Sequence, residues 1–201
     1  MHFVETFGKK GCLYGKVNSE QTIHKHLILE SRQGNQAAIS SLYGLYAQAM
    51  YNICRRMMGD EEEAKDLLQE SFVDAFQKLS KLREINTFSS WIKRIVVNNC
   101  INALRKKRLD TTQMEEGWDY MEEEEDDYEY TTFQANQIMG AIDKLPQGCK
   151  TVMNLYLFEG YDHKEIGEIL GITESASKAQ YCKAKGRVRN FLDKERSQYA
   201  G

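Results

Sequence analysis

Proline is nearly absent from this sequence, because Pro146 is the only one among the 201 residues. Proline breaks helices, and the apolar residues recur at intervals of three and four rather than alternating, so we expect an all-α fold. No stretch approaches the roughly 18 to 20 consecutive apolar residues of a membrane span. The first residues lack the apolar core of a secretory signal, and we therefore expect a cytoplasmic protein.

The sequence also lacks the patterns that bind metals or cofactors. Its five cysteines are widely spaced and form no Cys-x-x-Cys pair, which is typical of reduced thiols rather than zinc ligands or disulfides. There is no glycine-rich phosphate-binding loop. His24 and His26 lie far along the chain from any catalytic partner, and we interpret them as exposed helix residues. We expect no cofactor, no metal and no enzymatic activity.

Charge is distributed unevenly along the chain. The segment 111–132 carries ten acids and no Lys or Arg, so removing it takes the net charge from -3 to +7. A run of like charges repels itself and does not pack, which predicts a flexible linker between two folded domains. We therefore predict a disordered leader at 1–19, a first domain at 20–110, the acidic linker at 111–132 and a second domain at 133–201.

In the first domain, apolar residues with helical spacing predict helices at 37–58 and just after Asp60. Gly59 is a suitable C-terminal cap and Asp60 a suitable N-terminal cap. On the second of these helices Asp66, Glu70 and Asp74 recur every four residues. This acidic strip is either an ordinary solvated surface or a docking surface for a basic partner.

A third helix, predicted at 89–108, carries six cations and no acid: Lys93, Arg94, Arg105, Lys106, Lys107 and Arg108. Such a density is typical of surfaces that bind nucleic acid, although cations at a helix C-terminus also interact favourably with its dipole. Asn98 could pair with a base edge. Phe88 and Trp91 could stack on unpaired bases, or could pack in the core.

The second domain has the pattern of a helix-turn-helix. One helix is expected to stop at Pro146, a second at Gly160, and a short third spans 164–170. Gly171, Thr173 and the intervening apolar residue match the corner between two helices. The final helix, predicted at 175–192, has five cations and no anion up to Arg189, as insertion into a major groove requires.

Taken together, these motifs resemble those of bacterial sigma factors of the extracytoplasmic function (ECF) type, in the sigma-70 family. The residues that carry the resemblance are 60–72 (DEEEAKDLLQESF), 88–98 (FSSWIKRIVVN) with 104–108 (LRKKR), and 145–146 (LP) with 160–172 (GYDHKEIGEILGI). The resemblance implies a region 2 helical bundle, a variable linker and a region 4 helix-turn-helix.

The resemblance also implies partners, namely core RNA polymerase, promoter DNA and an anti-sigma factor. By matching positions, polymerase binding falls to Asp66, Gln69, Glu70 and Asp74. The loop 82–88 would hold a flipped base of the minus-ten element, with Asn98 nearby. Together with the resemblance, the basic helix predicts a set of minus-ten contacts: Phe88, Trp91, Lys93, Arg94, Asn98, Arg105, Lys106, Lys107 and Arg108.

Contacts with the minus-thirty-five element are expected from the last helix, at Ser175, Lys178, Ala179, Gln180, Cys182, Lys183, Lys185 and Arg187. The side chains of Ala179 and Cys182 cannot donate strong hydrogen bonds, so Lys178, Gln180 and Lys183, or DNA shape, would then carry the base recognition.

We therefore expect a sigma factor that directs promoter-specific initiation and strand opening. A stand-alone helix-turn-helix regulator and a helical protein-binding adaptor are the alternatives. The acidic linker is either a plain tether or a mimic of a nucleic acid strand in the polymerase.

Overall fold

The computed structural model describes residues 19–110 and 135–199, and every element in these residues is helical. The helices form two compact units, α2 to α5 and α6 to α9, which confirms the all-α, two-unit prediction. Among the described residues, no helix is long and apolar enough to cross a membrane. The predicted leader and acidic linker lie outside the described residues, except that Ser19 is the first residue of α2.

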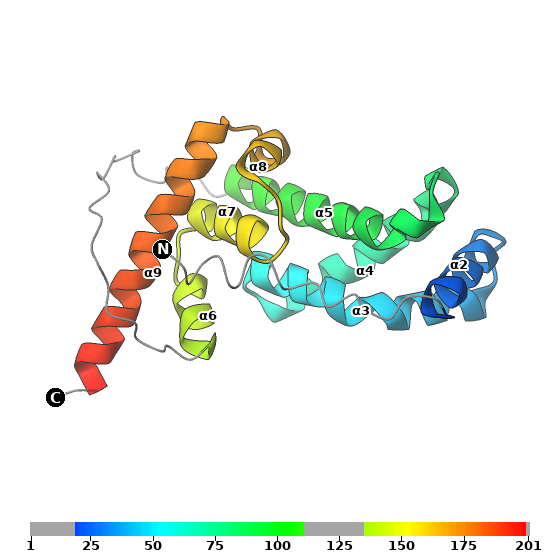
Figure 1. Ribbon diagram of the computed structural model, residues 1–201, viewed down its shortest axis with the longest axis horizontal. Coiled ribbons are helices and arrows are strands. Elements are labelled where there is room, and N and C mark those ends of the chain that lie inside the picture. The colour runs from blue at the N-terminus through cyan, green and yellow to red at the C-terminus, as the bar shows by residue number, and fades with distance from the viewer. Residues whose placement is uncertain (1–18, 111–134, 200–201) are drawn as a thin grey trace. The chain divides into compact units, whose positions relative to one another are not determined.

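Helix α3 (Gln36–Met58, labelled in Figure 1) packs against α2, α4 and α5 in the first unit. It begins after Asn35, whose side chain accepts hydrogen bonds from the backbone N–H groups of Ala37 (3.0 Å) and Ala38 (3.3 Å). It ends at Gly59, which has a φ of 81° and donates its N–H to the Arg55 carbonyl. A left-handed residue of this kind terminates a helix, so the predicted cap is confirmed.

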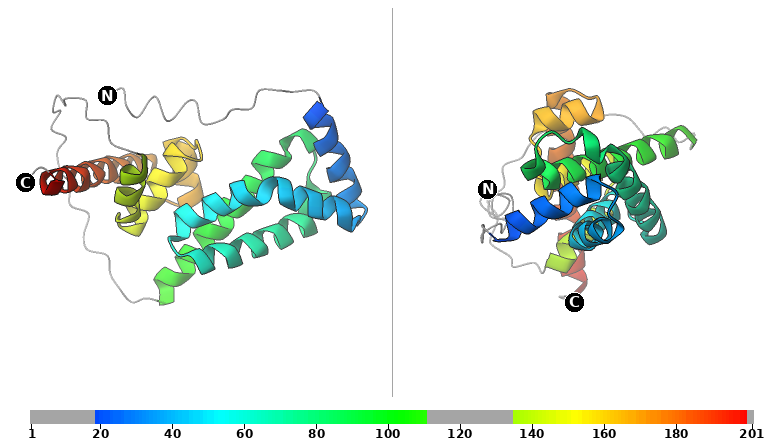
Figure 2. Two further views of the ribbon diagram at one scale, coloured as in Figure 1. Left: turned by 90° about the horizontal axis from the view of Figure 1, so that it is seen from below. Right: turned by 90° about the vertical axis from the view of Figure 1, so that its right-hand side faces the viewer.

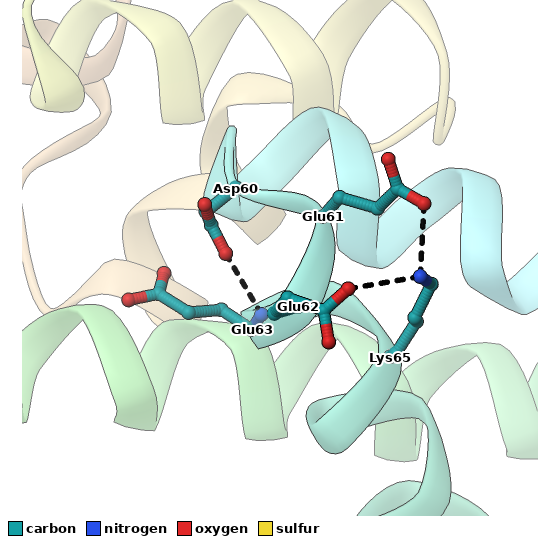
Figure 3. Close-up of polar contacts among 5 residues, drawn as sticks. All are labelled: Asp60, Glu61, Glu62, Glu63 and Lys65. Atoms are coloured by element: carbon teal, nitrogen blue, oxygen red, sulfur yellow. Dashed lines mark hydrogen bonds and ion pairs between the residues drawn. The ribbon is translucent and has the colours of Figure 1, made fainter.

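Helix α4 (Glu61–Lys78) follows directly and begins with the predicted cap (Figure 3). The Asp60 carboxylate accepts the backbone N–H of Glu63 at 3.0 Å, and this bond is the main reason why the pKa of Asp60 lies below its usual value. One turn later, Lys65 Nζ lies 2.9 Å from carboxylate oxygens of both Glu61 and Glu62. The acids of the first turn therefore stabilise the helix start.

Helix α5 (Phe88–Asp110) completes the core of the first unit, and its buried face packs against α3 and α4 (Figure 2). Ile92, Val96 and Val97 are completely buried. Cys54 of α3 and Cys100 of α5 meet in this core with their sulfur atoms 3.9 Å apart. These helices therefore form one hydrophobic core, which fixes the positions of the acidic strip on α4 and of the cationic residues on α5.

Helix α2 (Ser19–Arg32) also belongs to the first unit, and it contains His24 and His26, which were interpreted as helix residues although no bounds were predicted for a helix there. It packs on α3, with Ile28 1% exposed, and the neighbouring Leu29 remains 41% exposed. The helix therefore has a buried side that includes Ile28 and an exposed side that includes Leu29.

The second unit consists of α6 (Ala135–Asp143), α7 (Gln147–Leu157), α8 (His163–Leu170) and α9 (Glu174–Tyr199). As predicted, Pro146 separates the first two helices, and it occupies the N-cap of α7. Lys150 of α7 is almost fully buried and binds Asp143 of α6 at 2.7 Å. This ion pair fastens α6 to α7 across the proline.

The corner between α8 and α9 has the predicted helix-turn-helix geometry. Gly171 has a φ of 72° and donates its N–H to the Gly167 carbonyl at 2.8 Å. The Thr173 hydroxyl accepts the N–H of Ala176 at 3.0 Å and so caps α9. Asp162 and Glu165 add a capping box at the start of α8, which was not predicted. Helix α9 extends to Tyr199 and is longer than predicted.

Candidate functional sites

Three of the four residues predicted to bind a basic partner lie exposed on one face of α4. Asp66, Gln69 and Glu70 are exposed, whereas Asp74 is half-buried. The Asp74 carboxylate contacts Lys78 Nζ at 2.9 Å and Asn99 Nδ2 at 3.4 Å, and the bond from Lys78 is the main cause of its lowered pKa. The acidic strip is therefore strongest at its N-terminal end, because the charge of Asp74 is already partly neutralised.

Exposed apolar side chains lie beside this acidic face, and these apolar side chains were not predicted. Val73 of α4 is 56% exposed, and Tyr43 of α3 is 39% exposed. The Tyr43 ring lies 4.7 Å from the ring of Phe72, so the two helices share an aromatic contact beside the acids. Exposed apolar groups beside charges are typical of a protein-binding surface.

The structure separates the two aromatic residues at the start of α5. Phe88 is 2% exposed, and its ring meets Tyr46 edge-on with the ring centroids 5.1 Å apart. Phe88 is therefore a core residue in this structure, which removes it from the candidate DNA-contacting surface and favours the core-packing alternative. Trp91 is half-buried beside it, with its ring 5.9 Å from that of Phe88.

The polar residues of α5 divide between helix faces. Arg94, Asn98 and Arg105 are exposed and share one face by helical periodicity. Lys93 is half-buried, and Lys106 is exposed. Lys107 forms an ion pair with Glu63 of α4, and the side chain of Arg108 lies outside the described residues. The exposed stripe that could follow a nucleic acid strand thus centres on Arg94, Asn98 and Arg105.

The loop between α4 and α5 contains two 3-10 turns, η1 (Leu79–Lys81) and η2 (Ile85–Thr87). Leu82 and Phe88, at the two ends of the predicted base-holding loop, are buried. Between them the side chains of Arg83, Glu84, Asn86 and Thr87 are exposed. The loop therefore presents polar groups outward from two fixed ends.

On α9, helical periodicity places most predicted DNA-contacting residues on the face that points away from the core. This face contains Ser175, Lys178, Ala179, Cys182 and Lys183, all of them exposed or half-exposed. Lys178 Nζ lies 2.7 Å from Glu174 Oε1, and this bond raises the pKa of Lys178. A contact between Lys178 and DNA would have to replace this ion pair.

Of the other predicted residues of α9, Lys185 and Arg187 lie at the edges of that face by helical periodicity, whereas Gln180 turns toward α7. The Gln180 side chain leans on α7, where its Oε1 lies 3.2 Å from the point that a Cβ on Gly148 would occupy. Lys185 Nζ lies 5.5 Å from the centre of the Tyr181 ring, and the side chain of Arg187 is exposed. Gln180 is therefore the least suitably placed of the predicted base-reading residues.

An aromatic cluster that was not predicted fixes α9 against α7 and α8. The His163 ring stacks on Tyr156 with the centroids 4.6 Å apart, and Tyr181 contacts both rings. His163 Nδ1 lies 3.0 Å from the hydroxyl of Ser177, which is completely buried. Burial is the main cause of the lowered pKa of His163, and the charge of Lys178 lowers it further.

Comparison with known families gives two matches, one in each unit. Residues 42–109 match the family model for sigma-70 region 2, and residues 135–188 match that for sigma-70 region 4, so that together they cover more than half of the chain. Among curated relatives, the ECF RNA polymerase sigma factor SigW of Bacillus subtilis is 28% identical, with 84% of this chain and 96% of SigW aligned. SigE of Mycolicibacterium smegmatis is 26% identical, over 83% of this chain and 67% of SigE.

Solved structures show the same fold. CnrH in complex with the cytosolic domain of CnrY has a TM-score of 0.51 and 20% identity, over 85% of this chain and 97% of CnrH. The sigma factor RpoE from Bartonella quintana, in complex with the anti-sigma factor NepR, has a TM-score of 0.52 and 16% identity, over 77% of this chain and 96% of RpoE.

Proposed function

The chain belongs to the ECF group of the sigma-70 family, and from that membership we propose how its two units divide promoter recognition between them. As a sigma factor, it directs transcription initiation, and sigma factors are generally not enzymes. The observation that carries the proposal is that each family match falls on one helical unit with an exposed cationic helix face. A stand-alone helix-turn-helix regulator is disfavoured, because it would leave the region 2 match without a role.

Core RNA polymerase is proposed to bind the first unit at the acidic face of α4. Asp66, Gln69 and Glu70 are exposed there, and Val73 is 56% exposed between them and Asp74. Acids on this face would attract a basic polymerase surface, while Val73 and Tyr43 would supply apolar contact area. Asp74 would contribute less, because Lys78 and Asn99 already occupy its carboxylate.

Reversing the charge of Asp66 and Glu70 together tests this assignment. A single exposed ion pair contributes only about 0.2 to 1 kcal/mol, so the double variant Asp66→Lys with Glu70→Lys is needed to combine lost attraction with new repulsion. We expect capture of core polymerase in a pull-down to fall at least about tenfold, with unchanged helicity by circular dichroism.

A matched control keeps the total change in charge but moves it elsewhere. Glu168 of α8 and Asp193 of α9 are exposed and belong to the second unit rather than to α4. The variant Glu168→Lys with Asp193→Lys should therefore capture polymerase as the unmodified chain does. Equal capture by both double variants would show that the α4 face is not the polymerase contact.

For DNA, the proposal assigns the minus-ten element to α5 and the loop before it, and the minus-thirty-five element to α9. Arg94, Asn98 and Arg105 would follow the backbone and bases of the opened strand, and Lys178 and Lys183 would contact the duplex. Each stripe offers few base-reading groups. Two modest binding modules that act together gain affinity through effective concentration, so selectivity needs both.

The regulatory partner, the cellular location and the domain limits are also part of the proposal. An anti-sigma factor is the proposed regulatory partner, and the complex of the sigma factor RpoE with the anti-sigma factor NepR described above supports it by similarity of fold. The cytoplasm is the proposed location, because core polymerase and promoter DNA are there. The domain limits at 20–110 and 133–201, with a linker between them, complete the proposal.

A further inference from the structure

A residue of α2 holds the start of the loop between α4 and α5. Arg32, the last residue of α2, donates from Nε to the Leu79 carbonyl oxygen at 3.2 Å and from Nη2 to the Leu82 carbonyl oxygen. Leu79 is the first residue of η1, and Leu82 is the residue directly after the end of η1. A planar guanidinium can bridge two acceptors in a fixed geometry, whereas a lysine ammonium cannot reproduce that fork.

Helix α2 also supports the end of the same loop. The ring of Phe88, the last loop residue, packs edge-on against Tyr46 of α3. The Tyr46 hydroxyl in turn lies 3.3 Å from Nδ1 of His24 in α2. Helix α2 packs directly on η2 as well, in the middle of the loop. The loop is therefore held at both ends by contacts that begin on α2.

Between these supports, the loop backbone is ordered by its own hydrogen bonds while its side chains point to solvent. The Glu84 carbonyl accepts both the backbone N–H of Thr87 at 3.1 Å and the Thr87 hydroxyl at 2.8 Å. Arg83, Glu84, Asn86 and Thr87 are exposed. A fixed backbone with outward polar groups is what discrimination between bases requires, because a binding loop loses selectivity when its geometry is loose.

We propose that Arg32 is a positioning residue for minus-ten recognition. By fixing the carbonyls of Leu79 and Leu82, its guanidinium sets the path of the loop 82–88, and through that path it sets how well the loop distinguishes one base from another. Arg32 itself touches no DNA in this proposal. The inference rests on the proposed function, in which this loop holds a minus-ten base.

The test uses the full chain with core RNA polymerase and a promoter library whose minus-ten element is randomised. Arg32→Lys retains the charge but loses the fork, and Arg32→Gln loses both. The loss of a hydrogen bond from a charged group, such as those from Arg32 to the loop carbonyls, changes an equilibrium about tenfold. We therefore expect the preference among minus-ten sequences to fall roughly tenfold. Sequencing of the transcripts measures this preference. Gln33→Ala, at the exposed neighbouring residue, is the matched control.

Two further measurements distinguish positioning from a general loss of structure. Polymerase capture by Arg32→Lys and its helicity by circular dichroism should stay close to those of the unmodified chain. Preference in a second library, randomised in the minus-thirty-five element, should not change. A uniform loss of transcription across all minus-ten sequences, or an equal loss of preference in both libraries, would overturn the proposal.

A wrong assignment of the loop and a wrong role for Arg32 give different experimental results. If the unmodified chain enriches no minus-ten sequence at all, the assignment of the loop in the proposed function is wrong. If the unmodified chain shows a clear preference and both Arg32 variants retain it, that assignment stands and only the role of Arg32 is refuted.

Discussion

His163 joins three helices of the second unit through one ring, and its protonation should affect their stability. Its pKa is lowered mainly by burial and further by the charge of Lys178, while Glu174 and Asp162 act in the opposite direction. As the pH falls below about 6.5, the unfolded chain binds a proton that the folded chain resists. Stability should therefore be full above that pH and decline below it, until the lowered folded-state pKa is reached.

This effect can be isolated by comparing the unmodified chain with His163→Asn, whose amide can still reach the Ser177 hydroxyl. Urea unfolding at about pH 7.5 and about pH 5.5 should show a larger loss of stability for the unmodified chain than for the variant. Carboxylates that titrate in both proteins cancel in this comparison. An identical loss in the two proteins would mean that His163 does not carry the pH dependence.

At the residue scale, the sequence predicts contacts that are local and misses those that are not. Gly59, Asp60 and Thr173 were predicted as caps because a cap is defined by residues within one turn of it. Arg32 bonds to a carbonyl 47 residues away, and the stacking of His163 joins three different helices. No spacing rule indicates such partners, because only the packed fold brings them together.

At the scale of elements, the close packing of α8 against the corner depends on Gly167. A Cβ added there would lie 2.8 Å from the Ile172 carbonyl oxygen, which belongs to the backbone and cannot simply rotate away. Gly167→Ala should therefore destabilise the second unit by about 1 to 3 kcal/mol and weaken minus-thirty-five binding, measured by urea unfolding and by footprinting of the polymerase complex.

Gly186 provides the matched substitution in the same unit. It lies within α9, and a Cβ added there would meet nothing within 4 Å. Alanine has a higher propensity than glycine for the interior of a helix, so Gly186→Ala should stabilise the unit by about 0.5 to 1 kcal/mol. Destabilisation by both substitutions, or by neither, would contradict the steric role assigned to Gly167.

Most elements were predicted from the sequence because apolar residues recur at helical spacing and because glycine, proline and capping residues mark the helix ends. Helices α3, α4 and α5 begin within a residue or two of their predicted starts, and Pro146 and Gly171 separate the helices of the second unit as expected. The bounds of α2 were not predicted, although His24 and His26 within it were interpreted as helix residues. Helix α9 was predicted too short because its last turns carry few apolar residues to mark its end.

At the scale of the whole molecule, the two cationic units are proposed to act together only when both are bound to core RNA polymerase. Each unit has its own buried core, and each presents a separate charged helix face. The segment between them carries ten acids and no Lys or Arg, so it should compete with DNA for the same cations when the chain is alone. Core polymerase is therefore needed to hold both units on one promoter.

The most direct test of this claim is to reconstitute the full chain with core RNA polymerase on genomic DNA and to sequence the 5′ ends of the transcripts. We predict discrete start sites, each preceded by a shared minus-ten element and a shared minus-thirty-five element, that disappear when either the chain or the core enzyme is omitted. Transcripts that start at random, or a core enzyme whose start sites do not respond to the chain, would contradict the account.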